Sequence, residues 1–359
     1  MREDMIINRY SQVKIAGIAA AASSHWQSVE EAAECCGVEE DFNIEKFKKN
    51  TGVRGRYLAG NYQTTSDFCY AAGEALLQHF GIDRKQVGVL VFVSQMPDYE
   101  NPATACVLHK RLKLAQNCIA FDINQGCAGF VYGLNATAAL LQSSNLRYAL
   151  MLCGDTSAKD KSRGREENKG SHSTLLLFGD GGTATLLEKS NSSPLLFTSC
   201  TDGENFDAIM ISDHSWRHPW SCRPRFIDDV RVFNFSINKA PEMLKDYMEF
   251  MNSTPQDYDK LVLHQANMLI MKTVAKRAGF SLDKMLSSIE IFANTSSASI
   301  PNTIVNGYGE DCSLDILRFL CCGFGVGLSW AAVELRLSPS QILPLIHTDE
   351  WFDDGLPEE

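Results

Sequence analysis

The stretch DINQGCAGFVYGL, residues 122–134, places a cysteine between two different kinds of element. The apolar run before Cys127, CIAFDIN (118–124), is typical of a strand, and the small apolar residues after it (128–141) have helical spacing. A thiol at such a junction would face the unpaired N–H groups of a helix start, where the helix dipole favours a thiolate. From position alone, a buried and inert core cysteine is an equally good interpretation.

The composition is that of a globular protein and excludes several functions. The chain has 359 residues, of which 45% are hydrophobic and 21% charged, enough for one large core or two medium ones. A formal net charge of −11 argues against nucleic acid and against an anionic membrane surface as partners. No apolar stretch reaches membrane-spanning length, and MREDMIINRY lacks the apolar core of a signal peptide.

The twelve cysteines indicate a reducing compartment, which we expect to be the cytoplasm. None of them has CxxC spacing, and the adjacent pairs Cys35–Cys36 and Cys321–Cys322 are poor metal signatures. We therefore expect no metal site.

Strands and helices alternate, and their order repeats. In the first half we predict strands at 87–95, 118–124 and 148–155, a helix at 102–112, and a strand–turn–strand unit at 173–188 with its turn at Gly-Asp-Gly-Gly. In the second half we predict strands at 260–266 and 289–294, helices at 268–279 and 295–308, and a strand–turn–strand unit at 315–335. The repeat predicts two similar α/β halves, residues 1–190 and 191–345.

Three further stretches carry no regular pattern. Residues 159–173 are polar and charged, and residues 212–229 are aromatic, basic and irregular, so we expect both to be surface loops. The acidic tail, 346–359, has no recognisable motif and is expected to be disordered.

Three polar side chains fall at comparable places in the predicted strands. Cys127 follows one strand, His264 ends the strand LVLH, and Asn294 ends IEIFAN. A lone His at a strand end is more often structural, and a lone Asn before Thr is more often a helix cap. Sites in open α/β sheets lie beyond the carboxyl ends of the strands, so two packed halves would bring all three side chains together.

A Cys, a His and an Asn suit acyl transfer. The thiolate attacks a thioester, and the imidazole and amide N–H groups stabilise the resulting oxyanion or enolate. The glycine-rich stretch GFGVGLSW (323–330) would allow a backbone N–H to complete an oxyanion hole, although a tight turn between strands explains it equally well.

Several motifs, in one order, resemble those of the ketoacyl-acyl-carrier-protein synthase III family, which has the thiolase fold. They are NTGVRGRYLA (50–59), DINQGCAGFVYGL (122–134), LLFGDGGTATLLE (176–188), LVLHQAN (261–267), FANTSSASIP (292–301) and GFGVGLSW (323–330). The resemblance covers residues 12–336 and implies a cytoplasmic homodimer with a thiolase-like, five-layered αβαβα fold of two pseudo-duplicated halves.

The resemblance also implies a role for each site residue. Cys127 would carry the acyl group, while His264 and Asn294 assist decarboxylation of a malonyl thioester, whose carbanion then attacks that acyl group. The oxyanion hole would consist of the N–H groups of Cys127 and Val326. Phe324, Gly325 and Gly327 would support the site. No cofactor is implied, because acyl-CoA or the phosphopantetheine of an acyl carrier protein is the substrate.

Several residues depart from the pattern of the well-studied fatty-acid initiators. Lys46 and Asn50 stand where those enzymes hold the adenine of CoA with a Trp and an Arg, and Leu269 replaces an exposed Arg that docks the carrier protein. Asn101, before the Pro of NPATA, replaces an often apolar residue of the partner subunit's acyl pocket. The helix after His264 stays basic through Lys272, Lys276 and Arg277.

These departures favour a specialised homologue that is loaded from a carrier protein and serves secondary metabolism or glycan acylation. If the nucleotide is bound after all, the next candidates lie in the 212–229 loop: Trp216, Arg217, Trp220 and Arg223. Two alternatives stay open, namely acyl transfer to an alcohol or amine without condensation, and a non-catalytic partner subunit. Hydroxymethylglutaryl-CoA synthase shares the fold but needs an additional Glu base that this sequence does not reveal.

Overall fold

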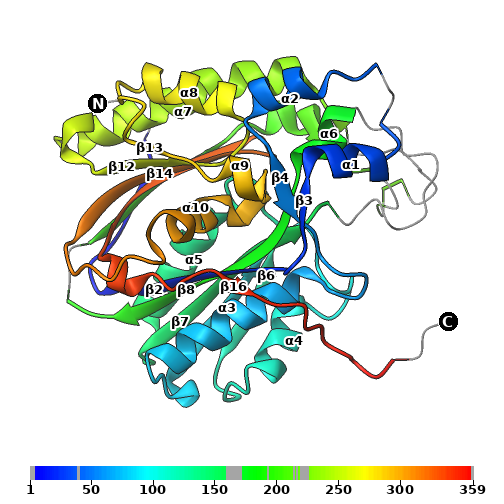
Figure 1. Cartoon of the computed structure of the whole chain (residues 1–359). Helices are drawn as coiled ribbons and strands as arrows, with labels where there is room; N and C mark the ends of the chain where they lie inside the picture. The colour runs from blue at the N-terminus through cyan, green and yellow to red at the C-terminus, as the bar shows by residue number, and fades with distance from the viewer. Residues whose placement is uncertain are drawn as a thin grey trace.

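Two six-stranded sheets form the framework of the protein (Figure 1). The structure, a computed structural model, describes residues 5–38, 41–158, 172–191, 194–212, 215, 217–218 and 226–356. The first sheet has the order β16-β2-β8-β7-β5-β6 and the second the order β1-β9-β15-β14-β12-β13.

The strands of the first sheet are β2 (Val13–Ala22), β5 (Val87–Val93), β6 (Ile119–Ile123), β7 (Tyr148–Thr156), β8 (Asp180–Lys189) and β16 (Ile346–His347). Those of the second are β1 (Ile7–Tyr10), β9 (Leu195–Thr201), β12 (Lys260–Leu263), β13 (Met285–Leu286), β14 (Leu317–Gly325) and β15 (Ser329–Leu337). Strand β5 pairs in parallel with β6 and β7, and all its residues are buried, as its continuous apolar run predicts.

Helices fill the remaining three layers. Between the sheets lie α5 (Gly129–Ser143) and α10 (Ser299–Tyr308). The outer face of the first sheet is covered by α3 (Thr65–His79) and α4 (Thr104–Arg111), and that of the second by α7 (Asp229–Phe250) and α8 (Met268–Arg277) (Figure 1). The predicted five-layered αβαβα arrangement is confirmed.

The two halves repeat one topology. The strand orders β2-β8-β7-β5-β6 and β9-β15-β14-β12-β13 match position by position, and α3, α4 and α5 correspond to α7, α8 and α10. Only the terminal strands cross over, because β1 joins the second sheet and β16 the first. The predicted duplication is therefore confirmed, while the boundaries at 190 and 345 stay predictions.

Two predicted strands are wrong. Residues His172–Leu177 form helix α6, and Gly-Asp-Gly-Gly leads directly into β8 instead of turning between strands. Residues Ile289–Phe292 form helix α9, in which Ile289 and Phe292 are buried and the two residues between them exposed. That spacing of three suits a helical turn, and short apolar runs do not distinguish it from a strand.

Smaller elements complete the chain. They are α1 (Val29–Cys35), α2 (Ile44–Thr51), the antiparallel pair β3 (Trp26–Ser28) and β4 (Gly55–Tyr57), and the pair β10 (Ile209–Met210) and β11 (Phe226–Ile227). The predicted loops 159–173 and 212–229 fall largely outside the described residues, and so do Trp216, Trp220 and Arg223. Among the helices that the structure describes, none is both long and apolar enough to cross a membrane.

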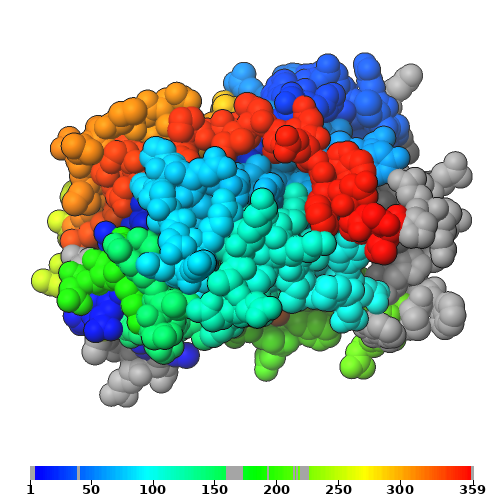
Figure 2. Space-filling view, turned by 90° about the horizontal axis from the view of Figure 1, so that it is seen from below, coloured from blue at the N-terminus to red at the C-terminus, as the bar shows by residue number. Residues whose placement is uncertain are grey.

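Residues 346–356 of the C-terminal tail pack against the first half, which corrects the prediction of disorder for this segment. Strand β16 pairs in parallel with β2, and the Gln63 side chain donates to the carbonyls of Thr348 (2.9 Å) and Glu350 (3.1 Å). In Figure 2 the red C-terminal segment lies against the blue and cyan surface of the first half. The contacts that hold it come from residues far away in sequence, which no local pattern reveals.

Candidate active site

Cys127 occupies the predicted junction. Strand β6 ends at Ile123, Cys127 lies in the following turn, and α5 begins two residues later with Ala128 as its N-cap. The residue is partly exposed, unlike the fully buried Cys153 and Cys321. The helix start and the partial exposure both fit a reactive thiol better than an inert core residue.

The glycine-rich end of β14 packs directly on Cys127. A Cβ atom at Gly325 would lie 2.6 Å from Cys127 Sγ, and one at Gly323 would lie 3.0 Å from the Cys127 carbonyl oxygen. Since real Cβ atoms do not approach so closely, only glycine allows this strand to pass the thiol. Val326 follows at once, and its Cγ2 would lie 3.2 Å from a Cβ at Gly126. Gly327, in a cis peptide with Leu328, completes the turn into β15.

His264 lies directly after β12, which pairs with β14, and its side chain contacts the same end of β14 that packs on Cys127. Its backbone N–H donates to the Cys322 carbonyl (2.9 Å), its Nδ1 lies 2.8 Å from Ser299 Oγ, and its ring stands at 88° to Phe324 with 5.8 Å between centroids. Burial lowers the pKa of His264 to about 3, although a hydrogen bond with the Ser296 backbone favours the charged ring. The ring is therefore neutral at neutral pH.

Asn294 is fixed by an unusual backbone. Ala293 and Ser296 have φ of 55° and 51°, values that cost a non-glycine residue about 1–3 kcal/mol each. The Ser296 N–H donates to Asn294 Oδ1 (2.9 Å), which turns the amide nitrogen away from Ser296. Asn294 does not cap α10, whose N-cap is Ala298, so its interpretation as a helix cap is not supported.

A buried arginine holds the segment that pairs with Asn294. Arg56 donates to the carbonyls of Leu175 (2.8 Å) and Phe178 (3.0 Å), and Phe178 forms a parallel bridge with Asn294. The Asn294 N–H in turn donates to the Leu177 carbonyl (2.9 Å). Sequence reasoning missed Arg56, although it lies within the motif NTGVRGRYLA.

Two of the three predicted residues thus meet at the end of β14, and the turn that holds the third packs against α5. The last residues of β14 contact Cys127 through Gly325 and His264 through Phe324. The Asn294 turn joins them because a Cβ at Gly129, two residues after Cys127, would lie 3.0 Å from Ser297 Cβ. Neither half alone supplies this set of groups.

The other predicted site residues lie apart from this centre. Lys272 and Lys276 are exposed on α8, and the Arg277 guanidinium donates to the Ile237 carbonyl (2.8 Å) on α7. Lys46 and Asn50 are exposed on α2, which packs beside α8, and Leu269 is 52% exposed. Asn101 is exposed before the cis Pro102, and Arg217 is exposed within the 212–229 region.

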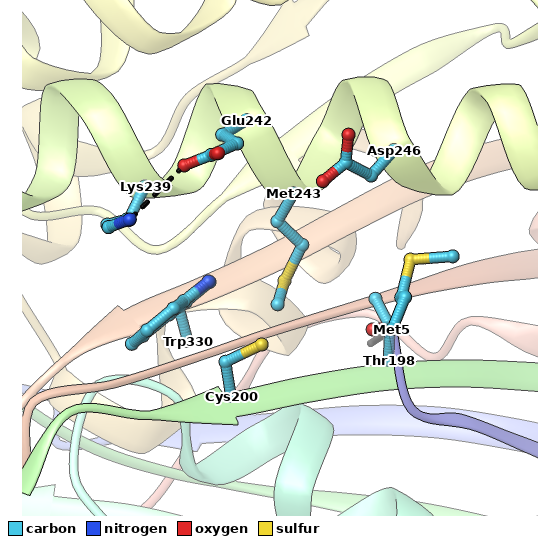
Figure 3. Close-up of a pocket in the computed structure, with 8 residues that line it drawn as sticks. All are labelled: Met5, Thr198, Cys200, Lys239, Glu242, Met243, Asp246 and Trp330. Atoms are coloured by element: carbon cyan, nitrogen blue, oxygen red, sulfur yellow. Dashed lines mark hydrogen bonds and ion pairs between the residues drawn. The ribbon is translucent and has the colours of Figure 1, made fainter. Parts of the chain in front are cut away.

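A cavity of about 190 Å³ lies elsewhere, against the outer face of the second sheet (Figure 3). It is lined by residues that include Lys239 and Met243 from α7, Cys200 from β9 and Trp330 from β15. None of the three predicted site residues lines it. The described residues contain no cluster of three metal-ligating side chains.

Comparisons with known proteins agree with this architecture. The sequence model of the family described as 3-oxoacyl-[acyl-carrier-protein] synthase III matches residues 121–203, and that of its C-terminal part matches residues 248–337. The beta-ketoacyl-[acyl-carrier-protein] synthase III of Oceanobacillus iheyensis is 30% identical over 82% of this chain and 91% of its own.

Solved structures agree as well. The 3-oxoacyl-(acyl-carrier protein) synthase of Burkholderia xenovorans superposes with a TM-score of 0.88 at 31% identity, covering 96% of this chain and 99% of its own. The synthase III of Pseudomonas aeruginosa gives 0.80 at 27% identity, covering 94% and 100%. The duplicated fold is that of the thiolase-like acyltransferases. Within that class, the chain belongs to the 3-oxoacyl-[acyl-carrier-protein] synthase III family.

Proposed function

We propose that this enzyme joins an acyl group held on Cys127 to a malonyl thioester, with loss of CO2. One observation supports this proposal most: a neutral His264 and a partly exposed Cys127 thiol both contact the end of β14, and the turn with the oriented Asn294 amide packs on the helix that follows Cys127. Neutral N–H donors stabilise a developing oxyanion without transferring their own proton.

In the first step the Cys127 thiolate attacks the carbonyl carbon of an acyl thioester. A carbon–sulfur bond forms to Cys127, the backbone N–H groups of Cys127 and Val326 hold the oxyanion, and the original thioester bond then breaks to release CoA or the carrier as a thiolate. The close approach of Gly325 and Val326 to the cysteine segment supports this assignment.

In the second step the malonyl thioester loses its carboxylate as CO2. The bonding electrons move onto the α-carbon, and the enolate oxygen accepts hydrogen bonds from His264 and Asn294. The carbanion then attacks the acyl carbonyl, the bond to Cys127 Sγ breaks, and a 3-oxoacyl thioester leaves the regenerated thiolate. Phe324, edge-on to the His264 ring, would shield this reaction from water.

We propose an acyl carrier protein as the preferred donor, since the relatives are named for that partner. The exposed lysines of α2 and α8 would attract its acidic surface, while Lys46 and Asn50 offer no aromatic and guanidinium contact for adenine. We also propose a cytoplasmic homodimer, and Ile119, 51% exposed on the edge strand β6, fits a subunit interface.

Substitution of the two donors tests the proposal. A single oxyanion donor typically contributes a factor of about 10²–10³ to the rate. His264→Ala and Asn294→Ala should therefore slow malonyl decarboxylation by that factor, while Cys127 can still be acylated. Release of CO2 from a labelled malonyl thioester and the intact protein mass give the two readouts. If both variants decarboxylate at the parental rate, or the parent protein does not decarboxylate at all, acyl transfer to an alcohol or amine becomes the better explanation. A protein that also fails to acylate Cys127 would be the non-catalytic subunit.

A further inference from the structure

A carboxylate that the proposed steps do not use lies buried between the two halves. Asp155, at the end of β7, is fully buried. Its Oδ1 accepts from Ser94 Oγ (3.1 Å) and from the Gln95 N–H (2.8 Å), and its Oδ2 accepts from Ser297 Oγ (3.2 Å) and the Ser297 N–H (3.4 Å). Among the ion pairs of the described residues, none involves this carboxylate.

The two oxygens contact different halves of the molecule. Oδ1 holds the segment after β5, where Gln95 Oε1 is so close to Gly126 that an added Cβ would lie 2.6 Å away. Gly126 is the residue before Cys127. Oδ2 holds Ser297, three residues after Asn294. One carboxylate therefore joins the cysteine segment to the asparagine turn.

The serine run around Ser297 extends this connection to the histidine. The Ser296 N–H orients the Asn294 amide (2.9 Å), and Ser299 Oγ lies 2.8 Å from His264 Nδ1. Ser297 Oγ also lies 3.2 Å from the Val93 carbonyl oxygen, which competes with Asp155 for the one hydroxyl proton. Each serine of TSSAS thus has a separate contact, which explains a small polar run inside the core.

We propose that Asp155 is a positioning residue that sets the place of Asn294 and His264 relative to Cys127. The proposal rests on the condensing function proposed above. Burying a carboxylate without a cation is costly, so its hydrogen bonds to both halves must offset desolvation. Burial raises the pKa of Asp155. The hydrogen bonds from four residues oppose that rise, namely Gln95, Ser296, Ser94 and Ser297. The backbone next to Asp155 has little room to move, because the strands are packed so closely that a Cβ at Gly154 would lie 2.7 Å from the Gly181 carbonyl oxygen.

Asp155→Asn tests this role with almost no change of size. The new NH2 group must face either the Gln95 N–H or the Ser297 N–H, and both only donate. A displacement of about 1 Å costs about 10²-fold in rate, so we expect malonyl decarboxylation to fall by about 10- to 100-fold. Acylation of Cys127 should fall much less, because the NH2 group will face Ser297, whose Oγ can accept a hydrogen bond, and the contact with Gln95 beside the cysteine segment is then kept.

Asp122→Asn is the matched control. Asp122 is a partly buried carboxylate of β6 that accepts from the backbone N–H groups of Thr104 (2.6 Å) and Ala105 (2.8 Å) at the start of α4. The substitution Asp122→Asn should leave the ratio of the decarboxylation rate to the acylation rate unchanged. Ser297→Ala removes the hydroxyl contacts with Asp155 and Val93 but keeps the Ser297 N–H, and should shift that ratio in the direction of Asp155→Asn even if the latter does not fold. Equal losses in both half-reactions, or an unchanged ratio in Ser297→Ala, would overturn the positioning role.

Amide hydrogen exchange tests the same idea without reference to activity. Exchange in residues 293–299 should be faster in Asp155→Asn, or in Ser297→Ala if Asp155→Asn does not fold, than in the parent, and unchanged in Asp122→Asn. If the parent protein proves unable to decarboxylate any malonyl thioester, the proposed function fails, and this measurement alone decides the role of Asp155. Parental exchange rates throughout 293–299 would then contradict it.

Discussion

Gly325 shows at the residue scale how an absent side chain makes room for the nucleophile. The resemblance through the motif GFGVGLSW assigned Gly325 a supporting place at the site, and the structure packs it on Cys127, while Phe324 lies beside His264. Cys127 and His264 could be located because each follows an apolar strand that is visible in the sequence, whereas the element before Asn294, α9, was predicted as a strand. Asp155, Ser297 and Arg56 could not be located, because their hydrogen bonds join segments that are distant in sequence.

Gly325→Ala should abolish acylation of Cys127. The added Cβ would lie 2.5 Å from Cys127 Cβ and 2.6 Å from Sγ, so the thiol or the strand must move. Intact mass after incubation with an acyl thioester measures the effect. Gly203→Ala, where nothing lies within 4 Å of the new atom, serves as the control and should acylate normally. An acylated Gly325→Ala variant would show that Cys127 and Gly325 are not packed as described.

His264 should make the stability of the protein depend on pH. The folded protein keeps the ring neutral down to about pH 3, whereas the unfolded chain protonates it near 6.5. Between these values the unfolded state binds more protons. The free energy of unfolding therefore decreases as the pH is lowered, by up to about 1.4 kcal/mol per pH unit from this residue. Urea unfolding at pH 7.5 and 5.5 should show a smaller difference for His264→Asn than for the parent. The same difference in both proteins would mean that the pKa of the buried ring is not lowered.

At the scale of elements, the C-terminal segment is fixed by one arginine between two aromatic rings. The Arg111 guanidinium lies 4.5 Å from the Tyr70 ring centroid and 4.7 Å from that of Phe352, and it pairs with Asp67 (2.9 Å). Asp67 also accepts from the Phe352 N–H (2.9 Å). The prediction of a disordered tail was wrong because the acidic composition of the tail does not reveal the folded surface, with Arg111 and Asp67, on which the tail packs.

Phe352→Ala should therefore destabilise the protein by about 1 kcal/mol, the usual size of a cation–π contact that is partly exposed. Leu356, 67% exposed in the same segment, provides the control, since Leu356→Ala removes no described contact. Thermal or urea unfolding compares the two. Equal stabilities of the two variants would show that the segment contributes nothing through this ring.

The errors in α6 and α9 also belong to this scale. IEIF and STLLL are short apolar runs, and periodicity over so few residues fits a strand as well as a helical turn. The long elements were predicted well, because β5, α5 and α8 each show a sustained pattern. Residues 289–292 do not form a strand of the second sheet, because β13 at Met285–Leu286 already occupies the edge position next to β12.

At the scale of the whole molecule, the chain is acidic, but four exposed lysines gather on two neighbouring helices. The net charge is −11, yet Lys46, Lys49, Lys272 and Lys276 are exposed on the neighbouring helices α2 and α8. Such a local field attracts an acidic carrier, and salt weakens it beyond about 10 Å at 0.1 M. The duplication of the two halves was predictable from the repeated order of elements, and the crossing of β1 and β16 between the sheets was not.

Reversing two of these charges should separate the two donors. Lys272→Glu with Lys276→Glu should slow Cys127 acylation from an acyl carrier protein and leave acylation from the same acyl group on CoA nearly unchanged. The effect should shrink at high salt. Lys85→Glu, an exposed lysine on the first half, should leave both rates as they are. Equal slowing with both donors would show that these lysines do not dock a carrier.

The most direct test of the central claim follows the protein mass through one turnover. After incubation with an acyl carrier thioester, the account predicts a mass increase of one acyl group, located on Cys127 by peptide mapping and absent in Cys127→Ser. Addition of a malonyl thioester should then return the protein to its original mass while CO2 and a 3-oxoacyl thioester appear in equal amounts. An acyl group that stays on the protein with malonyl thioester present, but leaves on addition of an alcohol or amine, would contradict the account.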